Sequence, residues 1–92
     1  MKKAELLDTA KKIVTGERQE HYGTAEDNFG RIANYWTAYL QAMGNDVTFA
    51  AADVAVMMIL MKVARLSADI THEDSWVDIA GYAACGSEIV NG

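Results

Sequence analysis

The stretch of the sequence from residue 50 to residue 61 constrains the fold more than any other. It is apolar almost all the way round a helix, and Asp53 is its one charged residue. A helix that is apolar on every face lies in the centre of a bundle or between subunits. Its most apolar part, residues 54–60, is far shorter than the roughly 20 residues that cross a bilayer. We therefore expect an internal helix and no membrane partner.

Size and composition add a second expectation. The chain has 92 residues, enough for a single helical domain, 1–92, and 51% of them are hydrophobic. A domain of this size buries only about 60–65% of the surface that its unfolded chain exposes. Because so many apolar residues are difficult to cover within one small chain, we expect self-association into a homo-oligomer.

The charge of the chain limits its ligands. A net charge of −5 disfavours unaided binding to a nucleic-acid backbone, which is itself negative. A small nucleotide needs only a local basic patch, so that ligand class stays open. Cys85 is the only cysteine, which excludes an intrachain disulfide and is typical of a reducing compartment. Glu5 and Asp8 interrupt any apolar run that a signal peptide would need, so we expect a cytoplasmic protein.

Hydrophobic periodicity and capping residues predict an all-α fold, a four-helix bundle-like single domain without proline. The expected helices cover about residues 3–15, 24–43, 48–66 and 71–90. Gly16 is suited to ending the first helix. Thr24 and Asp27 have the spacing of a capping box at the start of the second. Thr48 is expected to cap the third helix, and Thr71 begins a similar capping motif for the fourth.

Two pairs of opposite charges are expected to face each other across the last two helices. Lys62 and Arg65 are three residues apart, and Asp74 and Asp78 are four apart, so each pair shares a helical face. The short connection makes the two helices an antiparallel hairpin. The basic pair either forms ion pairs with the carboxylates or binds phosphate. Tyr82 continues the carboxylate face by one turn and would complete the wall of a small-ligand site.

Other polar residues suggest further sites, each with a simpler alternative. Asp53, Asp74 and Asp78 could hold Mg²⁺, which prefers carboxylate oxygens; Asp53 could equally be placed by the dipole at its helix N-terminus. The loop 17–23 is polar and aromatic, so its Arg18, His21 and Tyr22 could contact a ligand or lie on an ordinary surface loop. Six large apolar or sulfur-containing residues are expected in the core and not in a site: Trp36, Met57, Met58, Met61, Trp76 and Cys85.

Several segments together resemble a small phage-associated family without an assigned activity. The similar segments read ERQEHYG at 17–23, NF at 28–29, DVAVMM at 53–58, KVAR at 62–65 and EDSWVDIAGY at 73–82, with Trp36 between them. The resemblance covers about residues 15–85. More distantly, the pattern is similar to MazG-type all-α NTP pyrophosphohydrolases and to nucleotide-modification-associated phage domains. Those families imply four-helix subunits that oligomerise and hold Mg²⁺ on Glu-Glu-x-x-Glu and Glu-x-x-Asp motifs, and this chain has neither motif.

The resemblance and the residues leave three functional hypotheses. The first is a phage protein in the cytoplasm of the bacterial host that binds a nucleotide or nucleotide-derived signal and sequesters it from host defence, with no cofactor required. Its ligand contacts would be Arg18, His21, Tyr22, Lys62, Arg65 and Tyr82. The second is a Mg²⁺-dependent nucleotide pyrophosphohydrolase with Asp53, Asp74 and Asp78 as metal ligands. The third is a helical interaction module that acts on a host protein.

Overall fold

The computed structural model of the chain describes residues 1–16 and 24–92, and in this part every regular element is an α-helix. The helices are α1 (Lys3–Thr15), α3 (Ala25–Ala42), α4 (Ala51–Ala68) and α5 (Glu73–Asn91). The predicted all-α single small domain is confirmed. None of the helices in this part of the chain is both long enough and apolar enough to cross a membrane.

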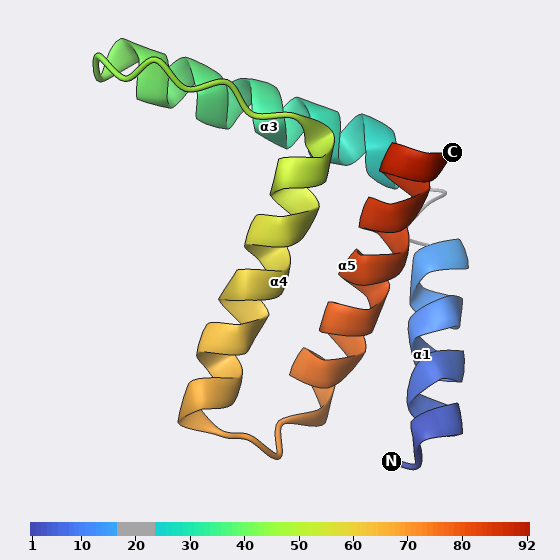
Figure 1. Cartoon of the computed structure of the whole chain (residues 1–92). Coiled ribbons are helices and arrows are strands. Elements are labelled where there is room, and N and C mark those ends of the chain that lie inside the picture. The colour runs from blue at the N-terminus through green and yellow to red at the C-terminus, as the bar shows by residue number, and fades with distance from the viewer. Residues whose placement is uncertain (17–23) are drawn as a thin grey trace.

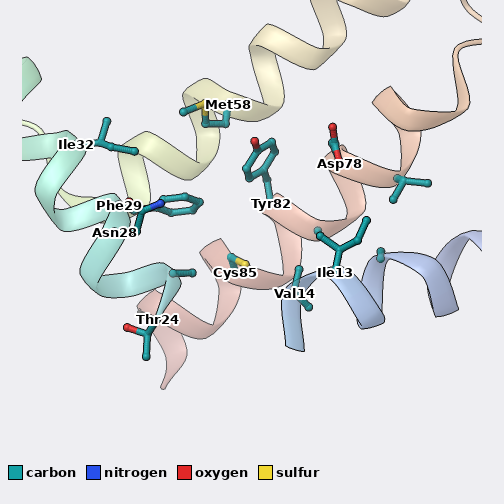
Figure 2. A pocket seen from close by; sticks show the side chains of 14 residues that line it. Ile13, Val14, Thr24, Asn28, Phe29, Ile32, Met58, Asp78, Tyr82 and Cys85 are labelled. Carbon is teal, nitrogen blue, oxygen red and sulfur yellow. The ribbon is translucent and has the colours of Figure 1, made fainter. Parts of the chain in front are cut away.

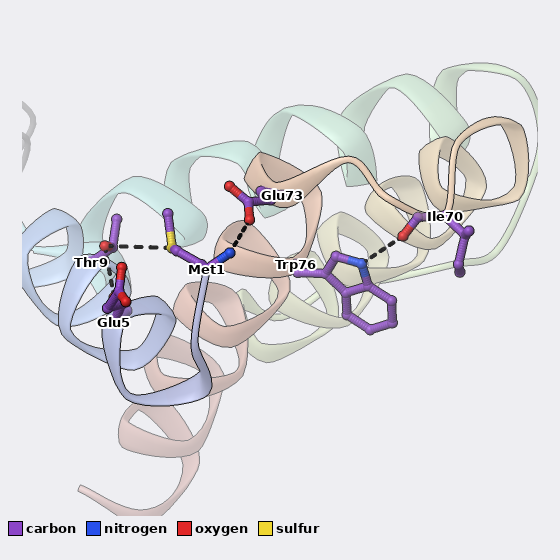
Figure 3. A network of polar contacts seen from close by, with 6 residues as sticks. All are labelled: Met1, Glu5, Thr9, Ile70, Glu73 and Trp76. Carbon is purple, nitrogen blue, oxygen red and sulfur yellow. Dashed lines mark hydrogen bonds and ion pairs between the residues drawn. The ribbon is translucent and has the colours of Figure 1, made fainter.

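The four helices form a hairpin flanked on one side and crossed at one end (Figure 1). α4 and α5 are the antiparallel hairpin, and α1 lies beside α5. α1 runs parallel to α5, since the amino group of Met1 pairs with Glu73 at one end and Val14 lies against Gly81 further along (Figure 3). α3 crosses the end of the hairpin, and its C-terminal half projects beyond α4 on the side away from α5 (Figure 1).

A small core lies where α3 meets the hairpin. Phe29 and Ala33 of α3 and Val54 and Ala55 of α4 are its buried members. The apolar start of α4 is therefore internal, as its composition predicts. Further along α4 the prediction is wrong, because Met57 and Met61 are exposed. They lie on a side of α4 that no other helix in the described part of the chain covers.

α1 begins and ends as its periodicity predicts, and α3 begins with the expected cap. The Asp27 amide donates to Thr24 Oγ1 over 3.1 Å. The predicted Thr48 cap is wrong, because α4 begins three residues later. There the carboxylate of Asp53 accepts a hydrogen bond from the Ala50 amide at 2.8 Å. The segment before α4 is held against α3, because the Phe49 amide donates a hydrogen bond to Thr37 Oγ1 over 2.8 Å.

The capping motif expected at Thr71 is also wrong. The Thr71 hydroxyl and amide both donate to Asp69 Oδ1, at 2.7 and 3.0 Å, and these hydrogen bonds hold the pKa of Asp69 below its usual value. α5 begins at Glu73. The residue before it, His72, forms a hydrogen bond of 2.8 Å through Nδ1 with the buried Ser75 hydroxyl. Trp76 was expected in the core, but the residue is 43% exposed, and its indole N–H donates to the Ile70 carbonyl at 2.9 Å (Figure 3).

The role of Asp53 at the start of α4 gives a first prediction. Replacing Asp53 with alanine removes the acceptor for the Ala50 amide, so we expect a loss of about 0.3–1.5 kcal/mol in the free energy of unfolding, the usual contribution of such a cap. Urea denaturation followed by circular dichroism measures the change. Asp46→Ala, an exposed carboxylate in the preceding segment, is the matched control and should change stability less. Equal losses in the two variants would show that the Asp53 hydrogen bond contributes nothing.

Candidate functional site

A cavity of about 250 Å³ opens where the four helices converge (Figure 2). Its walls are mainly apolar and come from every helix. The lining residues are Ala10, Ile13, Val14, Thr24, Ala25, Asn28, Phe29, Ile32, Met58, Val77, Asp78, Gly81, Tyr82 and Cys85. Most small-ligand sites in proteins have this character, an apolar hollow with a few polar groups.

Small residues on facing helices leave this space open. α1 approaches α5 closely at Gly81, where an added Cβ would lie 3.3 Å from Val14 Cγ1. Ala10 of α1 and Ala25 of α3 are also short, so the side chains around them do not close the gap. Two aromatic rings form the opposite wall: Phe29 and Tyr82 have centroids 6.0 Å apart and planes inclined by 45° (Figure 2).

An ion pair lies beside the cavity. Lys62 Nζ is 2.8 Å from Asp78 Oδ2, and the side chains of Lys62 and Asp78 are 12% and 28% exposed. Lys62 follows the lining residue Met58 by one turn of α4, and Asp78 is itself in the lining. Asn28, Thr24 and the Tyr82 hydroxyl are the other polar groups of the lining. The cavity therefore combines apolar walls with the partly buried carboxylate of Asp78, which is paired with Lys62 outside the lining.

The structure brings together some of the predicted ligand-binding residues and separates others. The expected pairing of a basic residue of α4 with a carboxylate of α5 is confirmed for Lys62 and Asp78, and Tyr82 shares the cavity wall with Asp78. Arg65 and Asp74 are exposed and outside the lining, and neither forms an ion pair within the described residues. The remaining predicted contacts, Arg18, His21 and Tyr22, lie outside the residues that the structure describes.

The three carboxylates considered for Mg²⁺ are not neighbours within one chain. Asp53 is in the first turn of α4 and Asp74 in the first turn of α5, and the two helices are antiparallel, so these residues lie at opposite ends of the hairpin (Figure 1). Asp78 is engaged by Lys62. Across residues 1–16 and 24–92, no three His, Cys, Asp or Glu side chains are grouped so that they could hold a metal ion.

Comparison with known proteins places the chain in a family. The sequence model described as "Domain of unknown function (DUF6378)" matches residues 5–90. The chain belongs to this family. It is also 49% identical over 78 residues to the Gene 55 protein of Mycobacterium phage L5, a match that covers 85% of this chain and 47% of the relative. The Gene 55 protein of Mycobacterium phage D29 is 40% identical over 84 residues, covering 91% of this chain and 52% of the relative.

These matches confirm the resemblance to a small phage-associated family. The chain spans about half the length of the curated phage relatives that it matches. No solved structure matches the chain. The family match extends from α1 to the last turn of α5, so the matched residues include each of the described helices that line the cavity.

Sequence reasoning missed most of the cavity: of its lining residues, only Asp78 and Tyr82 were predicted as site residues. Asn28 and Ile13 were not considered as site residues, and Cys85 was expected only in the core. Burial raises the pKa of the Cys85 thiol, with a smaller contribution from Glu88, so the thiol stays protonated and is a weak nucleophile. The one local signal was Gly81 next to Tyr82 on the carboxylate face, because a missing side chain beside an aromatic ring leaves room for a ligand.

Proposed function

We propose that this chain is a phage nucleotide-binding protein that holds the base of its ligand in the cavity between the four helices. The observation that carries the proposal is the cavity itself, with apolar walls, two aromatic rings and an ion pair at its edge. Its volume of about 250 Å³ lies just below the range of roughly 300–1,000 Å³ for drug-sized ligands. It would therefore admit a ring the size of a nucleobase, with the sugar and phosphate outside.

The lining groups suit a base. The rings of Phe29 and Tyr82 offer apolar faces, and stacking on an aromatic ring contributes about 1–3 kcal/mol per base. Asn28 can donate and accept hydrogen bonds, and the Asp78 carboxylate accepts them from ring N–H or amino groups. A base that carries adjacent N–H and amino donors would pair with one carboxylate in a bidentate manner.

Charge favours ligands with few phosphates. Lys62 is already neutralised by Asp78, and the chain carries a net charge of −5. A triphosphate would be repelled unless further cations were close. Arg65, one turn beyond Lys62, and Arg18 are the residues that we propose for this purpose. We therefore expect a nucleoside, a monophosphate or a nucleotide-derived signal to bind more tightly than a triphosphate.

Two further observations support the proposal of a protein that binds a nucleotide and does not hydrolyse it. The relatives are phage proteins, in keeping with a protein that sequesters a nucleotide signal from host defence. The nucleotide class itself is proposed from the sequence resemblance to MazG-type pyrophosphohydrolases, which the comparisons with known proteins do not include. Hydrolysis with Mg²⁺ is less favoured, because Asp53, Asp74 and Asp78 do not converge within one chain. Metal-independent binding is therefore the proposed activity.

A thermal-shift panel of nucleosides, nucleotides and cyclic nucleotides, with and without Mg²⁺, tests the proposal. A ligand present at a hundred times its Kd stabilises the folded chain by about 2.7 kcal/mol. We expect at least one panel member to raise the melting temperature without Mg²⁺. A flat panel at millimolar concentrations would overturn the proposal. Steady release of pyrophosphate or phosphate with Mg²⁺, abolished by Asp78→Asn, would replace binding with hydrolysis as the function.

Filling the cavity gives a second prediction. Cys85 lines the cavity, so Cys85→Leu places a larger side chain in open space (Figure 2). We expect ligand binding to fall at least tenfold while the melting temperature of the free protein falls little, because the added atoms occupy volume that is already empty. Ala84→Leu is the matched control: its neighbouring position on α5 is exposed, and binding should be unchanged. Isothermal titration calorimetry with the ligand found in the panel measures the affinity of each variant. An affinity of Cys85→Leu equal to that of the wild type would show that the ligand binds elsewhere.

A further inference from the structure

The C-terminal half of α3 carries exposed aromatic and apolar side chains. This segment, residues 35–43, is here named the α3 arm, and it projects beyond α4 (Figure 1). Tyr35 is 73% exposed, and Tyr39 and Met43 are each 66% exposed. Tyr35, Ala38, Tyr39 and Ala42 recur at helical spacing, so they form one stripe along the arm. In an isolated chain this apolar stripe would stay exposed to water, which is unfavourable.

A second exposed apolar surface lies on α4. Val56, Leu60 and Val63 are separated by four and three residues and share one face, here named the outer face of α4. All three are about half exposed or more. Residues 54–61 include no charged residue. Depletion of charge and enrichment of tyrosine and methionine are the marks of an interface centre.

The exposed area of the chain is larger than a folded monomer of its mass requires. Its accessible surface is 6536 Å², against about 5,200 Å² for a compact monomer of 10.0 kDa. The radius of gyration is 14.4 Å, against about 12 Å for a compact domain of this length. The surplus, roughly 1,300 Å², exceeds the about 800 Å² that each partner buries in a standard stable interface.

We propose that two copies of this chain form a two-fold symmetric dimer, with the α3 arm of each copy packed on the outer face of α4 of the other. Both surfaces belong to one chain, and the arm runs crosswise to α4 (Figure 1). A two-fold axis would bring the arm of each copy onto α4 of the other, so that both surfaces are buried in each copy. A partner of a different sequence would leave this self-complementarity unused.

The charge of the chain is compatible with self-association. Each copy carries −5, but none of the residues that form the two surfaces is acidic. Repulsion between exposed charges further apart than about 8 Å is largely screened at physiological ionic strength. Burial of tyrosine and leucine side chains then decides the association.

Analytical ultracentrifugation of the 92-residue chain tests the dimer. We expect twice the chain mass at micromolar concentration. Tyr39→Lys and Leu60→Glu should each reduce the sedimenting mass twofold, to that of one chain. Leu7→Glu, a similarly exposed leucine on α1, is the matched control and should leave the mass unchanged. Circular dichroism confirms that each variant is helical. A wild-type chain that stays monomeric at 100-fold higher concentration overturns the proposal and assigns the surface to a different partner.

Mixing the two interface variants tests which surfaces meet. In a Tyr39→Lys and Leu60→Glu heterodimer, one contact pairs the new lysine with the new glutamate, and the other contact is wild type. The equimolar mixture should therefore recover the dimer mass that each variant alone has lost. A dimer built from arm against arm, or from α4 against α4, would put the two changes in different contacts and would not be recovered. Absence of recovery therefore overturns the pairing of the arm with α4.

Discussion

Replacing Asp78 with alanine is expected to lower the free energy of unfolding by about 1.5–3 kcal/mol, the usual range for a hydrogen bond to a charged group. The partner that remains, Lys62, is only 12% exposed, so its ammonium group would lose the carboxylate without gaining full hydration. Lys62→Met keeps most of the aliphatic stem and leaves Asp78 unpaired at 28% exposure, so its cost should be smaller. Urea denaturation of the purified variants gives each value.

The double variant separates the ion pair from the surrounding packing. With both Lys62→Met and Asp78→Ala, no unpaired charge remains beside the cavity, so the total loss should be smaller than the sum of the single losses. Asp74→Ala, an exposed carboxylate in the first turn of the same helix, is the control and should cost less than about 1 kcal/mol. Strictly additive losses at Lys62 and Asp78 would mean that the 2.8 Å contact does not stabilise the fold.

Gly86→Val is expected to destabilise the chain toward the upper end of the about 1–3 kcal/mol that overpacking costs. An added Cβ at Gly86 would lie 3.0 Å from the Cβ of Ala55, which is buried in the core. Neither atom belongs to a flexible side chain, so α4 and α5 would have to move apart. Valine is chosen because its branched Cβ cannot rotate out of the contact.

A second helical glycine provides the opposite result. A Cβ at Gly30 of α3 meets nothing within 4 Å, so Gly30→Ala should stabilise the chain by about 0.5–1 kcal/mol through helix propensity alone. Denaturant midpoints of the two variants should therefore move in opposite directions from the wild type. A midpoint for Gly86→Val at or above the wild-type value would show that α4 and α5 are not packed as closely as the structure has them.

The hairpin joins the stability of the fold to the candidate site. Close packing at Gly86 and the ion pair of Lys62 with Asp78 hold α4 against α5, and both Asp78 and Tyr82 of α5 line the cavity. A variant that separates the two helices should therefore weaken ligand binding as well. Cys85→Leu has a different signature, because it fills the cavity without moving the helices.

Features that depend on residues within one or two turns could be predicted from the sequence alone. The bounds of α1, the cap of α3 by Thr24 and the internal position of Val54 and Ala55 follow from local hydrogen bonding and helical spacing. The pairing of Lys62 with Asp78 was also accessible, because a short connection fixes the direction of the next helix and so the faces that meet. The prediction could not choose between Lys62 and Arg65, which share a face.

Features that depend on where whole helices cross were decided only by the tertiary structure. Thr48 and Thr71 are good capping residues, yet neither caps a helix: Phe49 is held against α3, so that Asp53 bonds the Ala50 amide at the start of α4, and the Thr71 hydroxyl itself donates to Asp69. The apolar run of α4 was expected to be covered throughout, but α3 crosses only its start, which leaves Met57 and Met61 exposed. The cavity exists because short side chains from separate helices meet at one point, and no spacing within a single helix encodes that meeting.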